Sequence, residues 1–382
     1  MIIYITMLGV SILFSYISTK YDKILKNIFR ILSVIPFIIV SGFRYKVGTD
    51  YLFRYVPDYL IIFEGGDVPN LEIIMKIIIK FCCFITRDYC LFFFITSLMI
   101  NVLVFFAIYK YSKRPILSIL VYFIGSSFFL SMNLVRQYIS SAILLIAVIE
   151  YLNDRKKIKY IVLVAIAAGF HTFALFMAPI IFLNKKKYND IILIILCIVI
   201  AIFGEQITNF VLKLFSIFKF INLSKYSIYS GNKGNLPFSS LIVETAIYLY
   251  FSYVYKKNYS LLSNKDKEIS TVFINLQWLM ILFVVACSAN DLFIRVTSAL
   301  MIFQIISISY FYDLDTKNLK DKDNWKYSFI ILILIIILMG MSLIYSFVIR
   351  GSADVLPYRS IFERSQNIYS EMNHIEFLYN RR

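Results

Sequence analysis

Four charged or titratable side chains interrupt long apolar stretches of the sequence: Arg136, His171, Glu244 and Arg295. Charge inside a membrane span is costly, and such residues usually face the protein interior or a wet cavity and serve a function. A guanidinium group offers paired donors with a permanent charge, which suits a diphosphate. An imidazole titrates close to neutral pH, which suits a general base. These residue types predict a site for an anionic, lipid-borne ligand.

A second group of charges follows directly on an apolar stretch. The run Gly42–Tyr55 reads G-F-R-Y-K-V-G-T-D-Y-L-F-R-Y and contains Arg44, Asp50 and Arg54. These side chains lie beside a segment long enough to span a bilayer, where charge is usually kept for function. Asp50 is the second candidate for a general base, and it is alternatively an ion-pair partner of Arg44 or Arg54.

The candidate roles follow from the residue types. Arg136 and Arg295, with Arg44 next, are the candidate ligands of the diphosphate, and His171 is the first candidate for the base. Glu244 and Arg54 are further candidates for substrate binding. An arginine near a helix end also commonly extends to lipid headgroups, so each of these residues has a purely structural alternative.

The composition places these residues in a membrane protein. The 382 residues are 60% hydrophobic, with a mean hydropathy of +0.76, and apolar runs recur from end to end. This leaves no room for a separate soluble domain, so residues 1–382 are predicted to form one integral membrane domain. The net charge of +16 is interpreted as basic loops that bind membrane lipids rather than nucleic acid. The five cysteines lack metal-ligand spacing with histidine, and neither a metal nor a cofactor is expected.

Hydropathy predicts an all-α polytopic protein with about ten full transmembrane helices. The first of them lacks a basic n-region and a small-residue cleavage site, so it is expected to be a retained span. The ten predicted crossings are Ile2–Ser18, Asn27–Gly42, Cys90–Tyr109, Ile116–Met132, Leu134–Leu152, Ile191–Thr208, Phe238–Tyr255, Ile269–Cys287, Phe293–Tyr312 and Tyr327–Phe347.

Six short loops hold 22 of the 39 basic residues and should face the cytoplasm. An even number of crossings must then lie between Lys159 and Lys185, so Tyr160–Leu183 is predicted to be a re-entrant hairpin with its turn near His171. A single 24-residue span also fits by length, but it would place the following lysines outside. The six loops are Lys20–Arg30, Lys110–Arg114, Arg155–Lys159, Lys185–Lys187, Lys256–Lys267 and Lys317–Lys326.

The same count of membrane crossings predicts that Leu71–Thr86 is a helix on the outer side of the membrane and does not span it. Its charges at Glu72, Lys76 and Lys80 recur every four residues and should share one face of an interfacial helix. Three outer regions are expected: residues 43–89 with this helix, residues 209–237, and the C-terminal tail 348–382. The membrane-embedded charges and the histidine then gather at the outer side.

Two D-x-D sequences have the form that holds a divalent metal on nucleotide sugars. They are Asp313-Leu314-Asp315 and Asp321-Lys322-Asp323. Both are interpreted as part of a solvated cytoplasmic loop rather than as a metal site.

Five short motifs carry a resemblance that runs nearly from end to end of the chain, and the first is the most specific. The sequence resembles the EpsG family of polysaccharide polymerases, related to the Wzy-type polymerases of O antigen and capsule. The motifs are R-Y-K-V-G-T-D-Y at Arg44–Tyr51, N-L-V-R-Q-Y-I at Asn133–Ile139, G-F-H-T-F-A-L at Gly169–Leu175, I-R-V at Ile294–Val296 and P-Y-R-S at Pro357–Ser360.

The resemblance implies a glycosyltransferase of the bacterial inner membrane, with a GT-C-like architecture and a site facing the periplasm or cell exterior. Its donor and acceptor would be oligosaccharide repeat units on undecaprenyl diphosphate, and the function allows for a chain-length regulator as a partner. Tyr358 and Arg359 of the last motif become further candidates for substrate binding. A flippase for the same lipid-linked sugars and a glycan ligase remain the alternatives.

Overall fold

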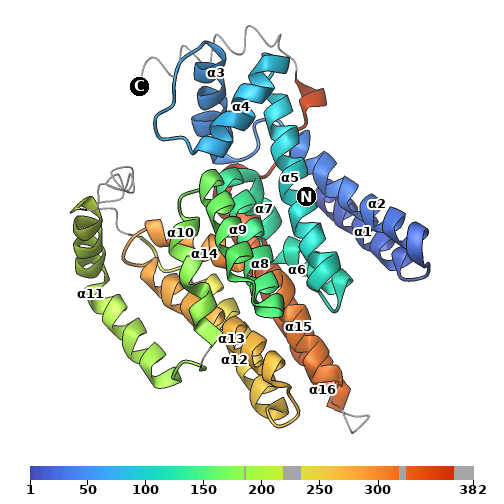
Figure 1. Cartoon of the computed structure of the whole chain (residues 1–382), viewed down its shortest axis with the longest axis vertical. Helices are drawn as coiled ribbons and strands as arrows, with labels where there is room; N and C mark the ends of the chain where they lie inside the picture. The colour runs from blue at the N-terminus through green and yellow to red at the C-terminus, as the bar shows by residue number, and fades with distance from the viewer. Residues whose placement is uncertain (185, 218–233, 318–323, 365–382) are drawn as a thin grey trace.

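The computed structural model describes all residues except 185, 218–233, 318–323 and 365–382. In this part of the chain every regular element is helical, and the one β pairing is an isolated bridge between Arg44 and Ser360. The long helices lie side by side in a bundle, and two short helices, α3 and α4, cover one of its ends (Figure 1). The protein is therefore an all-α polytopic membrane protein, as the hydropathy predicts.

Among the described residues, six helices are long and apolar enough to cross a bilayer, or up to eight if each of two bent pairs is one span. The predicted count of about ten crossings is not confirmed. By length and apolar character, α1 is too short to be counted as a full span and α12 is too rich in polar residues. The long elements are α1 (Ile2–Ser18), α2 (Lys23–Gly42), α5 (Cys90–Tyr111), α8 (Val135–Asp154), α11 (Asp190–Ile217), α12 (Phe238–Asn258), α13 (Asn264–Ala286) and α16 (Asn324–Leu343).

Two predicted crossings are broken. Helix α6 (Pro115–Ile124) meets α7 (Ser127–Asn133) at 54°, and α14 (Leu292–Met301) meets α15 (Gln304–Lys317) at 45°. The first break falls at Gly125 and Ser126, where Ser126 adopts the left-handed region with a φ of 67°. The bends turn α7 and α14 across the direction of the bundle, so that both can present side chains to a site at its end.

The segment Tyr160–Leu183 folds back on itself. Helix α9 (Lys157–Phe170) ends where His171 adopts an extended backbone, and α10 (Ala174–Met177) and the 3₁₀ turns of η2 (Ala178–Asn184) follow. The Tyr160 hydroxyl donates a hydrogen bond of 2.5 Å to the carbonyl oxygen of Ala178. The chain therefore reverses direction near His171, as the charge pattern predicts.

Residues 43–89 contain more structure than the single predicted helix. A π-helical turn, η1 (Tyr51–Tyr55), leads into α3 (Val56–Phe63), and α4 (Ile73–Ile85) follows. Helix α4 contacts α3, α5 and α9. A methyl group on Gly169 of α9 would lie 2.5 Å from the Ile74 side chain, so glycine is what allows α4 to pack this closely over the hairpin.

The ends of the bundle differ in charge. The described parts of the six basic loops all lie at the ends of the helices away from α3 and α4 (Figure 1). We call this the basic-loop end and the other the α3/α4 end. Helix α11 stands at one edge of the bundle, and its described part extends to Ile217, nine residues beyond the predicted limit at Thr208.

Candidate active site

Three buried ionisable side chains from separate helices meet beneath α4. The Glu72 carboxylate accepts a hydrogen bond of 2.5 Å from Nη1 of Arg136 through Oε2, and its Oε1 lies 3.1 Å from Nδ1 of His171. The exposed fractions of the three side chains are 4%, 13% and 7%, respectively. Buried charges are costly unless they are paired in this way. We call these three residues the Glu72 cluster.

The local structure explains how the three side chains reach one another. Glu72 is the residue before the first turn of α4 and has an extended backbone. Arg136 lies in the first turn of α8, and His171 is the residue at which α9 ends. A helix terminus leaves the chain free to change direction, so each of these positions can turn its side chain toward the space under α4.

The geometry assigns the proton on the imidazole. A carboxylate that is ion-paired with an arginine can only accept hydrogen bonds, so Nδ1 of His171 carries the hydrogen that faces Glu72. The second ring nitrogen, Nε2, then holds a lone pair and can accept a proton. Glu72 therefore orients the histidine and selects this tautomer.

Asp50 is held in a loop beside the cluster. The Asn133 side-chain oxygen at the end of α7 accepts hydrogen bonds from the Asp50 backbone N–H (2.8 Å) and the Thr49 hydroxyl (2.9 Å). Gly48 precedes them with a φ of 102°, and a methyl group there would lie 3.1 Å from the Met132 carbonyl oxygen. Glycine is required because the backbone is left-handed and packs directly on α7.

Electrostatics links Asp50 to three arginines. Burial raises the pKa of the Asp50 carboxyl group, and the charges of Arg295, Arg136 and Arg54 oppose this rise. Arg295 acts most strongly of the three. The structure thus brings two of the predicted diphosphate ligands, Arg136 and Arg295, close to Asp50.

Helices α8 and α14 are also joined directly. The Gln137 side-chain amide donates a hydrogen bond of 2.6 Å to the backbone carbonyl of Arg295. Because Gln137 follows Arg136 in α8, this bond fixes the relative positions of the two helices that carry the arginines. The arrangement presents guanidinium groups from two helices to one region, as a diphosphate requires.

Arg54 is paired within its own segment rather than with Asp50. Its Nε lies 3.0 Å from the Asp58 carboxylate, one turn further along. Burial raises the pKa of Asp58, against the charges of Arg54 and Arg136. Burial also raises the pKa of the Tyr55 phenol to about 12, and the Asp50 charge adds to this rise. Asp58 and Tyr55 therefore extend the charged and polar surroundings of Arg136.

Arg44 occupies a different place from the one predicted. Its side chain is 2% exposed, donates to the backbone carbonyls of Ser41 and Met132, and lies with its guanidinium carbon 4.7 Å from the Phe93 ring centroid. It does not join the Glu72 cluster. The reason is that α2 ends at Gly42 and the next residues pack inward beneath the loop, so Arg44 stabilises the loop that carries Asp50.

The last sequence motif packs on the first through its backbone. The Tyr45 N–H donates to the Arg359 carbonyl oxygen, and the Ile361 N–H donates to the Phe43 carbonyl oxygen, both at 2.9 Å. The Arg359 side chain is exposed, and the Tyr358 ring lies against Tyr4 with centroids 5.5 Å apart. The segment with Tyr358 and Arg359, which are predicted to bind substrate, therefore packs against the loop that carries Asp50. Neither residue belongs to the Glu72 cluster.

Glu244 is likewise separate from the cluster. It is 2% exposed and accepts hydrogen bonds from Gln277 (2.6 Å) and Gln304 through Oε2. These amides come from α13 and α15, so Glu244 belongs to a polar layer on the other side of α14.

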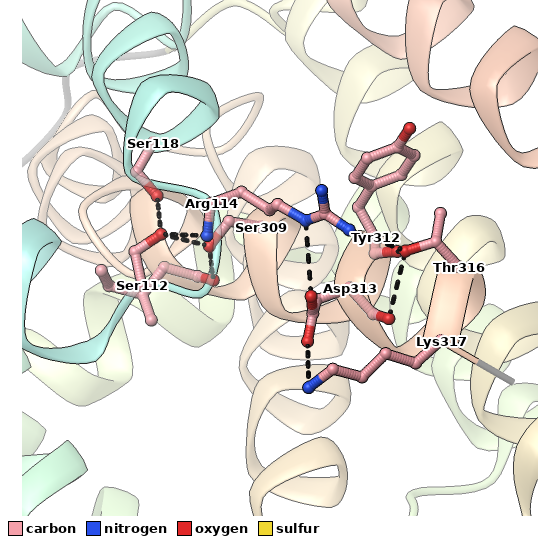
Figure 2. Close-up of polar contacts among 9 residues, drawn as sticks. Ser112, Arg114, Ser118, Ser309, Tyr312, Asp313, Thr316 and Lys317 are labelled. Atoms are coloured by element: carbon pink, nitrogen blue, oxygen red, sulfur yellow. Dashed lines mark hydrogen bonds and ion pairs between the residues drawn. The ribbon is translucent and has the colours of Figure 1, made fainter. Parts of the chain in front are cut away.

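The D-x-D sequence at Asp313 and Asp315 is not in a solvated loop. Both residues lie in the last turns of α15 and are buried. Asp313 pairs with Arg114 (3.4 Å) and Lys317 (2.9 Å), as Figure 2 shows, and Asp315 pairs with Lys257 (2.8 Å). The helix extends further than hydropathy indicates because these ion pairs neutralise its acidic end. The second D-x-D sequence, at residues 321–323, lies outside the described residues.

An apolar cavity of about 510 Å³ lies beside the hairpin that carries His171. It lies between α11 on one side and the hairpin, α13 and α14 on the other. Phe173, two residues after His171, and Val296, next to Arg295, form part of its wall. The wall of the cavity is almost entirely apolar, and it includes close sequence neighbours of His171 and Arg295.

Sequence reasoning identified Arg136, His171, Arg295 and Asp50 but missed the role of Glu72. The four-residue spacing of Glu72, Lys76 and Lys80 predicts one polar helix face. In the structure α4 starts only at Ile73, Glu72 turns inward, and Lys76 pairs with Asp67. The helix predicted from the sequence begins at Leu71, so the position of Glu72 before the first turn of α4 is known only from the structure.

A bundle of apolar helices with a buried acid, base and guanidinium cluster at one end defines a multi-pass membrane protein with the groups of a group-transfer site. The EpsG family model matches residues 27–360, and the chain belongs to the EpsG family. This membership indicates a membrane protein of polysaccharide biosynthesis with a polymerase-like, glycosyltransferase-type role. Comparisons with curated proteins and with solved structures find no match.

Proposed function

We propose that the protein is a polysaccharide polymerase that acts at the outer leaflet of the bacterial inner membrane. It transfers a growing glycan from undecaprenyl diphosphate to the non-reducing end of a second lipid-linked repeat unit, in the synthesis of O antigen, capsule or exopolysaccharide. The observation that carries this proposal is the Glu72 cluster with Asp50 and Arg295 beside it, at the end of the bundle opposite the basic loops. Basic loops usually face the cytoplasm, which supports an outward-facing position for the cluster.

The reaction needs a base and a stabilised leaving group. A hydroxyl of the acceptor attacks the anomeric carbon of the donor, a new C–O bond forms, and the bond to the diphosphate breaks. His171 takes the hydroxyl proton on Nε2, with Asp50 as the second candidate for this step. The diphosphate departs with the bonding electron pair.

Arg136 and Arg295 stabilise the charge that develops on the diphosphate. Arg136 uses Nη1 for Glu72, and a guanidinium has five N–H donors, so further donors remain for phosphate oxygens. Charges held ready in a site that excludes water contribute strongly to such a step. The burial of the Glu72 cluster provides this environment.

The apolar cavity supports a lipid-borne donor. A polyprenyl chain that leaves lipid gains free energy chiefly through close packing, and a cavity lined by aliphatic and aromatic side chains supplies such contacts. Because the cavity wall includes the neighbours of His171 and Arg295, a chain held there would place its diphosphate at the arginines.

The test is the length of the surface glycan in cells whose own copy is deleted and which carry the wild type or a variant at matched membrane levels. We expect a ladder of chain lengths with the wild type and single repeat units with Arg136→Ala or His171→Ala. Lys265→Ala, in the first turn of α13 at the basic-loop end, is the matched control and should restore the full ladder. If deletion traps lipid-linked units in the inner leaflet, the protein is a flippase and the proposal is wrong.

A further inference from the structure

A second cavity lies on another face of α14. It measures about 200 Å³ and is enclosed by the ends of α12, α13, α15 and α16 together with the turn between α6 and α7. Unlike the apolar cavity, it is lined by many side-chain hydroxyls. The hydroxyl-bearing residues in its wall are Ser126, Ser240, Thr297, Ser298, Ser342, Ser346 and Ser352.

Helix α14 separates three environments. Successive residues of an α-helix are turned by roughly 100°, so positions three or four apart share a face. Leu292, Phe293, Val296 and Leu300 line the apolar cavity, whereas Ile294, Thr297, Ser298 and Met301 line the hydroxyl-rich cavity. Arg295 lies on the remaining face, toward Asp50. One short helix thus borders an apolar chamber, a polar chamber and the candidate diphosphate site.

Polar side chains lie at both the mouth and the base of the hydroxyl-rich cavity. At the mouth, the Arg350 side chain is exposed and Ser346 is half-buried. At the base, Glu244 and Gln304 are buried and joined by a hydrogen bond. Apolar side chains of Val243 and other residues fill the remaining wall. A ligand that enters would pass hydroxyls first and then meet a carboxylate with an adjacent amide.

The hydrogen bonds at the base leave acceptors facing the cavity. The hydroxyl hydrogens of Thr297 and Ser298 are donated to the Ile294 carbonyl oxygen, at 2.9 Å and 2.6 Å. Both amides that bind Glu244 donate to its Oε2. The oxygens of Thr297 and Ser298 therefore accept further hydrogen bonds, and a ligand hydroxyl can donate to Oε1 of Glu244.

We propose that this cavity, lined by hydroxyls and closed by Glu244 and Gln304, binds a sugar ring of the acceptor repeat unit. This assignment rests on the proposed polymerase function and adds a subsite to it. Sugars carry several hydroxyls that both donate and accept, and their C–H faces pack on aliphatic side chains, so they match both kinds of lining.

Size and charge favour a sugar over other ligands. The volume of about 200 Å³ is below the roughly 300–1,000 Å³ of pockets for drug-sized molecules, so it suits one or two rings rather than a whole oligosaccharide. Among the lining residues that the structure describes, Glu244 is the one carboxylate and Arg350 the one cation. A buried carboxylate at the base disfavours phosphate and other anions.

Direct binding tests this assignment. The full-length protein in lipid nanodiscs is titrated with the repeat-unit oligosaccharide released by mild acid from its lipid carrier in the producing cells, and binding is followed by saturation-transfer NMR. Ser346→Phe fills the half-buried mouth, and Thr297→Val removes one acceptor at the base without changing the side-chain shape. We expect each to weaken binding about tenfold or more, the loss expected for one or two hydrogen bonds.

Two further variants separate the possible outcomes. Met341→Phe adds the same ring on the lipid-exposed side of α16 and should bind as the wild type does. Arg136→Ala should bind the free oligosaccharide normally while making no glycan ladder. If Ser346→Phe and Thr297→Val bind like the wild type, the sugar site is refuted, even where a ladder shows the protein to be a polymerase. If they lose binding but deletion of the protein leaves the ladder intact, the subsite stands and the polymerase function is wrong.

Discussion

Two glutamates at opposite ends of the bundle each bind two basic side chains, but in different surroundings. Glu150, in the last turn of α8, contacts Lys110 and Lys159, and each of these lysine side chains is 47% exposed. Glu72 contacts an arginine and a histidine that are almost entirely buried. The first arrangement is screened by water and closes the ends of helices. The second keeps its charges largely out of water, which is costly unless they are paired.

The comparison shows that paired charges alone do not identify a site in this protein. The basic-loop end contains more ion pairs than the Glu72 cluster, including those of Asp313 (Figure 2) and that of Asp315. What distinguishes the cluster is that all three of its side chains, the two cations as well as the acid, are largely buried. Burial raises the strength of each interaction because the local dielectric is low.

The largest effect is expected at the histidine. His171→Ala should lower the rate of polymerisation by about 10²–10⁴-fold, since it removes the general base. Glu72→Gln should lower it as well, because the amide no longer holds the same tautomer of His171. The measurement is chain growth from purified lipid-linked repeat units. Wild-type rates for both variants would show that the cluster takes no part in the reaction.

Arg136 should come next. Arg136→Ala should lower the rate by about 10²–10³-fold, the cost of losing one donor that stabilises developing charge. It also leaves the Glu72 carboxylate buried with one charged partner fewer, so the folded protein should be destabilised by several kcal/mol, about 3–5 for a broken buried pair. Arg136→Lys separates the two effects, because it restores the charge but not the paired donors. Thermal unfolding in nanodiscs and initial rates are the readouts, and equal rates for arginine and lysine would exclude bidentate binding.

The pH dependence should show a smaller effect that can be traced to Asp50. Burial raises its pKa in the folded protein, so the carboxylate forms only above the ordinary value of about 3.9. A rate that needs this carboxylate falls as the pH drops through the raised pKa. Asp50 should affect the stability of the folded protein in the opposite direction. Its contribution to stability is present at low pH and is lost as the pH rises through the raised pKa. Initial rates for the wild type and Asp50→Asn, from neutral to mildly acidic pH, test this, and an unchanged acidic limb in the variant would rule out Asp50.

The smallest effect is expected at the basic-loop end. Lys110→Ala removes one partner of Glu150, but the second lysine remains and the lost pair is half exposed, so the cost should be below about 1 kcal/mol. The rate of polymerisation should change less than threefold at matched membrane levels. Because a tenfold change equals about 1.4 kcal/mol, a threefold change equals about 0.7 kcal/mol. A loss as large as that of Arg136→Ala would remove the contrast between the two ends and would require a role for the basic-loop end in the reaction.

The fold follows from the sequence to the extent that it depends on local pattern. The apolar runs predict α1 with the observed limits and α2 to within a few residues at one end, because burial in lipid requires such runs. The turn at His171 follows from the lysines on both sides of the hairpin. The bends at Ser126 and between α14 and α15 were not predicted, since they depend on packing between helices rather than on the composition of either segment.

The residue types by themselves determined that Arg136, His171, Arg295 and Asp50 are candidates, because a charge inside an apolar stretch is costly enough to be informative. Only the tertiary structure decided which candidates meet. It added Glu72, which binds side chains 64 and 99 positions away, and it placed Arg44 in the support of the loop. Contacts over such separations depend on how α4, α8 and α9 pack, and no local pattern of residues encodes that packing.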